Sequence, residues 1–250
     1  MSAPLISIIT VTYNAASTIE PTLESIKKQT FTDYEFLLMD GASTDNTLDI
    51  VRRADIEGAR IFSSPDKGLY DAMNKGLGEA QGTYVVFLNA GDSFHSSETL
   101  EIIARAAEEN DVPGVIYGQT DIVDSSRQKI ADRHLIAPEH LTLDSFKEGM
   151  MVCHQAFVAL RRIVPLFNTD FRYSADYDWC IQCLQHARHT FYTGETLIDY
   201  LSEGISTANR RRSLIERFRI MSYYYGFWPT AVRHLGFIGR FINYQKSLKK

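Results

Sequence analysis

The sequence is short of the features that mark secreted, membrane-spanning or repetitive proteins. It has three cysteines, Cys153, Cys180 and Cys183, and this odd number fits a reducing compartment better than a disulfide framework. There is no internal repeat and no run of about 18 apolar residues that would mark a membrane span. Residues 1–4 lack the basic stretch of a signal peptide. These absences predict a cytoplasmic protein.

Two common phosphate-binding motifs are absent as well. The first strand-like segment is not followed by G-x-G-x-x-G, and G-x-x-x-x-G-K-[ST] occurs nowhere in the chain. A phosphate ligand would therefore need a metal ion to neutralise its charge.

The first hundred residues show a regular alternation of strand and helix patterns. Strand-like segments at 5–13, 34–40, 60–63 and 84–88 are separated by helical patterns and short loops. This order predicts an α/β fold with a mainly parallel sheet and helices on both faces. Further along the chain we expect strands at 114–121, at 128–136 and within 151–160, and helices at 97–109, 175–186, 213–225 and 230–247.

Polar residues stand where three of these strands end. They are Tyr13-Asn14, Asp40 and Asp92, the last after the small pair Ala90-Gly91. Ligands of open α/β sheets bind beyond the carboxyl ends of the strands. We therefore expect a crevice at this edge, with Asp92 suited to a metal-bound phosphate, although a single aspartate there is also a common turn residue.

Several segments resemble one known family. Thr12-Tyr13-Asn14 and Asp40-Gly-Ala-Ser-Thr-Asp45, with the elements between them, resemble the nucleotide-binding half of family 2 glycosyltransferases, which have the GT-A fold. Ser64-Pro-Asp-Lys-Gly-Leu-Tyr-Asp-Ala-Met-Asn-Lys-Gly76 and Phe87-Leu-Asn-Ala-Gly-Asp92 resemble the subgroup of bacterial exopolysaccharide and O-antigen gene clusters, the colanic-acid type included. The resemblance is closest over residues 5–95 and weakens beyond about 205.

The resemblance implies a nucleotide-sugar donor, usually a uridine diphosphate sugar, and inversion at the anomeric carbon. Tyr13 would lie against the base, Asp40 would hydrogen-bond it, and Asp66 would help to close the pocket. The full set of implied donor-binding residues is Thr12, Tyr13, Asn14, Asp40, Asp66 and Asn89.

The resemblance also implies a divalent cation, Mg²⁺ or Mn²⁺, bound by Asp92. Such a cation would bridge the diphosphate and stabilise the charge that grows on the leaving group. The chain departs from the family here, because the usual Asp-x-Asp reads Asn89, Ala90 and Gly91, and a single carboxylate, Asp92, follows.

A catalytic base is implied by Ala175-Asp176-Tyr177-Asp178-Trp179, which resembles the family's Glu-Asp motif with Ala in place of Glu. In this register Asp176 takes the proton of the acceptor hydroxyl, and Asp178 is the second choice. The alternative is that Asp176 only favours the start of a helix.

The acceptor is assigned four residues from the same part of the chain. Trp179 offers either a platform for a sugar ring or a core side chain. His154 and Gln155 match a pair that the family often places near the acceptor. The implied acceptor-binding residues are thus His154, Gln155, Asp178 and Trp179.

Cys180-Ile-Gln-Cys183 is a C-x-x-C within a predicted helix. His186 would be the third ligand of a zinc site, but residues at i, i+3 and i+6 of one helix cannot enclose a tetrahedral ion. We expect both cysteines to pack in the core.

The C-terminal tail differs from the rest of the chain in charge. Residues 205–250 carry ten lysines or arginines and one acid, a net charge of +9 that leaves −14 for residues 1–204. Aromatic residues are interleaved, and Leu235, Ile238 and Ile242 share one helical face with Arg233 and Arg240 at its border. This pattern favours contact with anionic lipid at a membrane surface over a helix packed on the core, and both over nucleic-acid binding.

Together these observations predict an inverting GT-A glycosyltransferase of bacterial surface polysaccharide synthesis. Residues 1–95 would bind the donor, residues 96–204 would bind the acceptor, a saccharide that we expect to be lipid-linked, and residues 205–250 would touch the inner face of the membrane. Two alternatives stay open: a nucleotidyltransferase, which usually has a basic glycine-rich first loop, and a non-catalytic partner that only binds nucleotide sugar.

Overall fold

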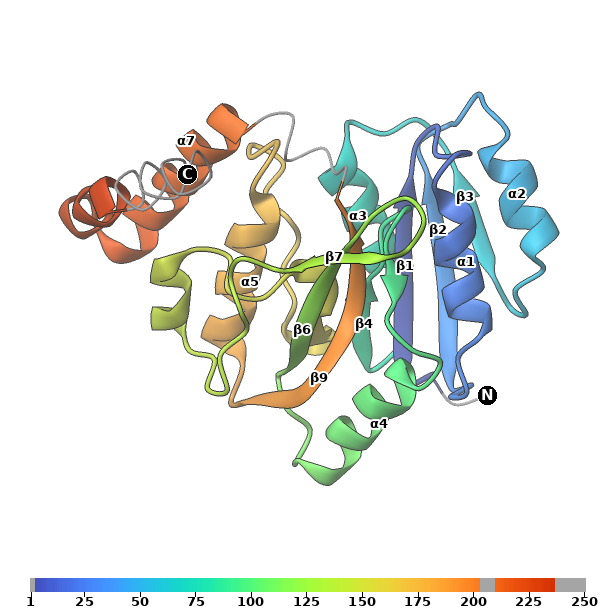
Figure 1. Cartoon of the computed structure of the whole chain (residues 1–250), viewed down its shortest axis with the longest axis horizontal. Coiled ribbons are helices and arrows are strands. Elements are labelled where there is room, and N and C mark those ends of the chain that lie inside the picture. Colours follow the sequence, from blue (N-terminus) through green and yellow to red (C-terminus); the bar gives the residue numbers. More distant parts are fainter. Residues whose placement is uncertain (1–2, 203–209, 237–250) are drawn as a thin grey trace.

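The structure, a computed structural model, describes residues 3–202 and 210–236. One nine-stranded sheet runs through the molecule in the order β3-β2-β1-β4-β8-β6-β9-β5, with β7 paired to β6 (Figure 1). The strands are β1 (Ile6–Thr12), β2 (Tyr34–Asp40), β3 (Arg60–Ser63), β4 (Tyr84–Phe87), β5 (Ser93–Phe94), β6 (Val115–Val123), β7 (Lys129–Asp132), β8 (Phe157–Leu160) and β9 (Thr190–Leu201).

Helices surround this sheet and extend from one end of it (Figure 1). The α-helices are α1 (Ile19–Lys27), α2 (Thr47–Ala54), α3 (Leu69–Glu79), α4 (Thr99–Glu109), α5 (Ala175–His186) and α7 (Arg210–Tyr225). Three short 3₁₀ helices are η1 (Leu143–Glu148), η2 (His154–Ala156) and η3 (Arg161–Ile163).

The strands β3, β2, β1 and β4 form the parallel half of the sheet, as the sequence predicted. Their register sets Thr12 beside Asp40 and Asp40 beside Ser63, so these strands end along one edge. Gly76 lets α3 approach closely, because a Cβ there would lie 2.5 Å from Ile9 Cγ2. The strand register and the close packing of α3 on β1 and β2 thus fix where the carboxyl ends of these strands lie.

The other half of the sheet is mixed. The predicted pairing of two strands after residue 114 is confirmed by β6 and β7, and the strand expected within 151–160 is β8. The sequence did not predict β9, which lies between β6 and β5. Its residues are mostly half-buried, with Gly194 at its middle, so the alternation that marks a strand is weak.

The predicted helix at 175–186 is confirmed as α5, and Cys180 and Cys183 are fully buried in the core, as expected. Beyond α7 the chain is helical again over 227–236, and the rest of the expected helix at 230–247 lies outside the described residues. Among the residues described, no helix is both long and apolar enough to cross a membrane. One sheet takes strands from both 1–95 and 96–204, and these boundaries stay predictions.

Candidate active site

The edge where the parallel strands end carries a buried carboxylate. Asp40 is 3% exposed, and it accepts hydrogen bonds from the Ser43 amide and hydroxyl and from the Ser63 hydroxyl. These bonds hold the carboxylate in place at the end of β2. A ligand N–H group that approached the Asp40 carboxylate would compete with the two serine hydroxyls for its oxygens, and these hydroxyls can rotate to other hydrogen-bond partners.

Three other predicted donor residues gather around Asp40. A Cβ on Gly41 would lie 2.6 Å from Asp66 Oδ2 and 3.3 Å from the Tyr13 ring, so Tyr13 and Asp66 face each other across this glycine. Tyr13 is 65% exposed, and its ring is open to a ligand. The Thr12 hydroxyl is buried and has no hydrogen-bond partner in the described part of the chain.

Asn14 holds two loops together at the same edge. Its amide oxygen accepts a 2.9 Å hydrogen bond from the Thr44 backbone, and its own backbone N–H donates to the Ser43 hydroxyl. Its φ of 48° lies in the left-handed region, which asparagine tolerates well. Asn14 therefore holds the loop after β1 against the loop after β2.

A row of polar side chains brings together predicted residues from distant parts of the sequence. Tyr70 OH donates to Asp176 Oδ1 at 3.1 Å, and Asp176 Oδ2 lies 3.4 Å from His154 Nδ1. On the other side of the imidazole, Nε2 lies 3.2 Å from Asn89 Nδ2. Asp176, His154 and Asn89 thus form one continuous group.

This row selects one tautomer of His154. In the neutral imidazole, Asn89 Nδ2 donates to Nε2, and the ring proton sits on Nδ1 and points at Asp176. The same orientation leaves Asn89 Oδ1 buried and without a partner among the residues described. An unsatisfied buried oxygen is costly, so this atom is suited to a ligand.

Asp176 begins α5 and has a side chain that is 17% exposed. Burial acts to raise its pKa, but the hydrogen bond and charge of His154, with the charge of Arg217, outweigh it and hold the pKa below its usual value. Asp176 is therefore ionised at neutral pH, as a proton acceptor must be.

Asp92 lies beside this row but is enclosed. Its Oδ2 accepts from Gln155 Nε2 at 2.6 Å, and its Oδ1 accepts from the Leu201 backbone at 3.0 Å. Burial raises its pKa to about 6, although both hydrogen bonds and the nearby Arg127 favour the charged form. Asp92 thereby ties the 89–92 turn to the end of β9 and to Gln155.

Two expectations for the acceptor are corrected. Trp179 is completely buried, stacks on Phe167 at 5.0 Å and donates to the Pro165 carbonyl, so it is a core side chain and cannot lie under a sugar ring. Asp178 is 5% exposed and accepts from Gln182 and Tyr224, which places its carboxylate at the contact of α5 with α7. Neither joins the Asp176 row.

Two residues that the sequence did not single out belong to the site. Tyr70 stands within the Ser64–Gly76 segment, so the motif contained the signal, but its partner is 106 residues away. Arg127, in the turn between β6 and β7, donates to the Gly91 carbonyl and to the Ser93 hydroxyl, and so fixes the 89–92 turn from outside. No local pattern marks it.

A group of possible cation ligands lies on β6 and β9 and just after β5. One ligand atom each from His95, Asp121 and Asp199 lies within 4.8 Å of the others. Within the group, His95 pairs with Asp199 at 2.7 Å, and Lys129 pairs with Asp121 at 2.9 Å. Lys129 already balances the Asp121 charge, so these residues are explained as an ion-pair network.

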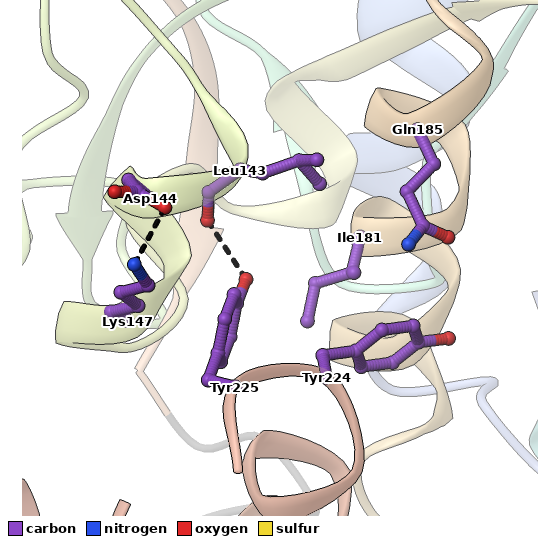
Figure 2. A pocket seen from close by; sticks show the side chains of 7 residues that line it. All are labelled: Leu143, Asp144, Lys147, Ile181, Gln185, Tyr224 and Tyr225. Atoms are coloured by element: carbon purple, nitrogen blue, oxygen red, sulfur yellow. Dashed lines mark hydrogen bonds and ion pairs between the residues drawn. The ribbon is translucent and has the colours of Figure 1, made fainter. Parts of the chain in front are cut away.

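A cavity of about 360 Å³ lies between η1, α5 and α7, apart from the Asp176 row (Figure 2). The Tyr225 hydroxyl bonds the Leu143 carbonyl on one side, and Ile181 and Gln185 of α5 form the other (Figure 2). None of its lining residues belongs to the predicted donor or acceptor set.

Comparison with known proteins decides the family. The family model described as Glycosyl transferase family 2 matches residues 7–164. The chain belongs to glycosyltransferase family 2. It is therefore a glycosyltransferase, and the matched range contains all the site residues described above except Asp176 and its neighbours.

Curated relatives agree. A PGL/p-HBAD biosynthesis glycosyltransferase of Mycobacterium tuberculosis is 35% identical over 192 residues, which cover 74% of this chain and 72% of that protein. A putative teichuronic acid biosynthesis glycosyltransferase, TuaG of Bacillus subtilis, is 27% identical over 79% of each chain.

The fold matches solved structures of the GT-A type. TarS 1–349 of S. aureus, in complex with UDP-GlcNAc, matches with a TM-score of 0.71 at 19% identity over 88% of this chain and 65% of that chain. The mannosyltransferase PcManGT of Pyrobaculum calidifontis, in complex with GDP-Man and Mn²⁺, matches with a TM-score of 0.64 over 88% of this chain and 64% of that chain. The chain thus spans less than two thirds of either, and the predicted GT-A fold is confirmed.

Proposed function

We propose that this glycosyltransferase moves a sugar from a nucleotide diphosphate donor, a UDP-sugar, to a saccharide acceptor with inversion at the anomeric carbon. The observation that carries the proposal is the continuous row from Asn89 through His154 to Asp176. It joins the edge where the donor residues stand to an ionised carboxylate at the start of α5.

The donor half of the proposal rests on the open edge of the parallel strands. Tyr13 presents an exposed ring, and Asp40 and Asp66 offer acceptors for the N–H groups of a base. The TarS structure contains UDP-GlcNAc and the PcManGT structure contains GDP-Man, so both support a nucleotide-sugar donor, and uridine is our proposal for the base.

A divalent cation, Mg²⁺ or Mn²⁺, fits the 89–92 turn in part. Asn89 Oδ1 is a buried oxygen without a partner, and oxygen is the ligand atom such ions prefer. Asp92 would have to release the Gln155 amide to contribute a carboxylate oxygen. When bound, the cation would neutralise the diphosphate; Asn89 would hold it, and Asp92 would supply negative charge beside it.

Proton removal is assigned to Asp176. Tyr70 and His154 each donate to one oxygen of its carboxylate, which fixes the plane of the group. The acceptor hydroxyl would give its proton to Asp176 as its oxygen attacks the anomeric carbon, and the nucleoside diphosphate would leave on the opposite face. His154 would stand on the acceptor side, and Gln155, which is 1% exposed and bonded to Asp92, would act by holding the 89–92 turn.

The donor proposal is tested by calorimetric titration of UDP and UDP-GlcNAc, with and without Mn²⁺. We expect metal-dependent binding that weakens at least tenfold in Asn89→Ala. A ligand at about 100 times its Kd should also stabilise the fold by about 2.7 kcal/mol. Folded protein that binds no uridine nucleotide would contradict the donor assignment.

We further propose that the acceptor is lipid-linked and that the C-terminal helices meet an anionic membrane surface at the cytoplasmic side. Half of the exposed large apolar side chains of the described residues lie between 214 and 235, among them Tyr223 at 83% and Trp228 at 76% exposure. Exposed arginines accompany them on α7, and α7 stands out from the body at the left of Figure 1. The exposed apolar residues are Leu214, Ile215, Tyr223, Phe227, Trp228, Val232 and Leu235.

This combination of apolar and basic groups is what an anionic lipid surface attracts. Leu235 of the predicted apolar face is 70% exposed, and Arg233 pairs with Glu148; Ile238, Arg240 and Ile242 lie outside the described residues. The names of the relatives, which refer to PGL/p-HBAD and teichuronic acid biosynthesis, support a glycan or glycolipid product.

The surface is tested by sedimentation with vesicles of phosphatidylcholine alone or with phosphatidylglycerol. We expect binding to the anionic vesicles only, reduced several-fold in the double variant Trp228→Ala, Leu235→Ala. Leu166→Ala is the matched control, because Leu166 is 64% exposed elsewhere on the molecule. Equal sedimentation with both vesicles, or none, would contradict membrane contact.

A further inference from the structure

The inner face of α7 is fixed against the segment that leads into α5. Ser213 Oγ lies 3.0 Å from Ser174 Oγ, and the Glu216 carboxylate accepts from the backbone N–H groups of Arg172 and Tyr173 at 3.0 and 2.8 Å. These contacts place one face of α7 directly over the start of α5.

Arg217 lies on this face, one helical turn after Ser213. Its Nε is buried and has no hydrogen-bond partner among the described residues. Its charge acts on two members of the site: it helps to hold the pKa of Asp176 below its usual value, and it opposes in small part the rise that burial gives the pKa of Tyr70. Arg217 is therefore a cation held beside the catalytic row.

Other arginines of α7 are placed differently. Arg212 is exposed and donates to the Tyr173 hydroxyl at 3.2 Å, and Arg219 is exposed to solvent. A buried N–H group without a hydrogen-bond partner lowers the stability of the fold. An anion that accepts a hydrogen bond from Arg217 Nε would remove this loss, and the free energy recovered would add to the affinity of the anion. Arginine is also the side chain best shaped to bind phosphate through two parallel hydrogen bonds.

We propose that Arg217 binds a phosphate group of a substrate held beside Asp176, so that α7 contributes directly to the active site. The inference rests on the proposed function, which supplies two sources of phosphate: the diphosphate of the donor and the phosphate of a lipid-linked acceptor. The C-terminal part of the chain then has two roles, with Arg217 toward the site and the exposed apolar residues of α7 and of residues 227–236 toward solvent.

The test compares Arg217→Gln with the matched control Arg219→Gln by calorimetry. UDP, uridine and inorganic pyrophosphate are titrated into each protein, and pyrophosphate is also titrated into protein saturated with UDP. If Arg217 binds the donor diphosphate, Arg217→Gln weakens UDP at least tenfold and leaves uridine unchanged. If it binds the acceptor phosphate, UDP is unchanged, and pyrophosphate binding to the UDP-saturated protein is lost. Arg219→Gln should match wild type throughout.

The proposal is overturned if all affinities of Arg217→Gln equal those of the wild type, or if the wild type binds neither UDP nor pyrophosphate. If only the donor assignment fails, the result is different. Uridine nucleotides would then not bind the wild type, pyrophosphate would still bind the wild type, and pyrophosphate would not bind Arg217→Gln. If Arg217→Gln does not fold, the same titrations are made with Arg217→Lys. This variant keeps the positive charge but lacks the planar guanidinium that forms two parallel hydrogen bonds. A several-fold weaker phosphate affinity in that variant supports the proposal, and unchanged affinities overturn it.

Discussion

Asp40 and Asp176, the carboxylates of the two sides of the proposed site, are held in place in different ways. Asp40 ends a buried parallel strand, and its partners Ser43 and Ser63 come from the adjoining loop and the neighbouring strand end. Asp176 begins a helix, and it is held by Tyr70, 106 residues earlier, and by His154. The donor edge is therefore built from local strand geometry, and the catalytic side depends on contacts between distant elements. The division predicts that variants of the two sides will separate donor binding from turnover.

The largest effect is expected from Asp176→Asn. Loss of the general base should lower the transfer rate by about 10²- to 10⁴-fold and leave UDP affinity nearly unchanged, because the donor edge is untouched. Product formation and calorimetric titration of UDP measure the two quantities on the same protein.

Asp178→Asn is the control two residues away. It should keep most of the transfer rate and lose about 1–3 kcal/mol of unfolding free energy, because Asp178 accepts hydrogen bonds from Tyr224 and Gln182 within the fold. If this variant lost turnover and Asp176→Asn kept it, the assignment of the base would be reversed.

A smaller effect is expected from His154→Gln, and it is specific in pH. The His154 hydrogen bond and charge help to hold the Asp176 pKa below its usual value, so their loss should raise that pKa. Because the base must be ionised, the acid limb of the kcat/KM profile should move to higher pH.

Tyr70 and Arg217, which also face Asp176, are unchanged in this variant, so the shift reports His154 alone. A profile with its acid limb at the wild-type position would show that His154 does not act on the base.

The smallest effect on turnover is expected from Gly41→Ala, on the donor side. A Cβ there would lie 2.6 Å from Asp66 Oδ2, and the carboxylate would have to move. We expect UDP affinity to fall about tenfold, corresponding to about 1.4 kcal/mol, with the rate of the bound donor unchanged. Gly78→Ala is the control, since a Cβ there meets nothing within 4 Å. A fall in turnover at saturating donor would show that the two sides are not separable.

The sequence predicted the ends of β1 and β2 well for a physical reason. Continuous apolar runs predicted β1 and β2, and parallel strands in a common register must end together, so Thr12 and Asp40 were expected to be neighbours. The grouping of Asn89 with Asp176 and His154 was implied only by the family resemblance, since it depends on pairings that no local pattern contains.

The residues that sequence reasoning misplaced are those whose environment depends on packing. Trp179 and Asp176 are three positions apart on one helix, yet the first lies in the core and the second is partly exposed and bonded to Tyr70 and His154. Their positions in the sequence do not show which of the two is buried, because both lie in the first turns of α5. The strand β9 was missed because its residues are half-buried, although its end at Leu201 is held by Asp92.

The central claim is that transfer occurs in a single displacement with Asp176 as the base. It is tested most directly by the ¹H NMR spectrum of the product, recorded immediately after transfer from a donor of known anomeric configuration. The account predicts that the new glycosidic bond has the opposite configuration to the sugar–phosphate bond of the donor. A product that retains the donor configuration would contradict the single displacement and the role of Asp176.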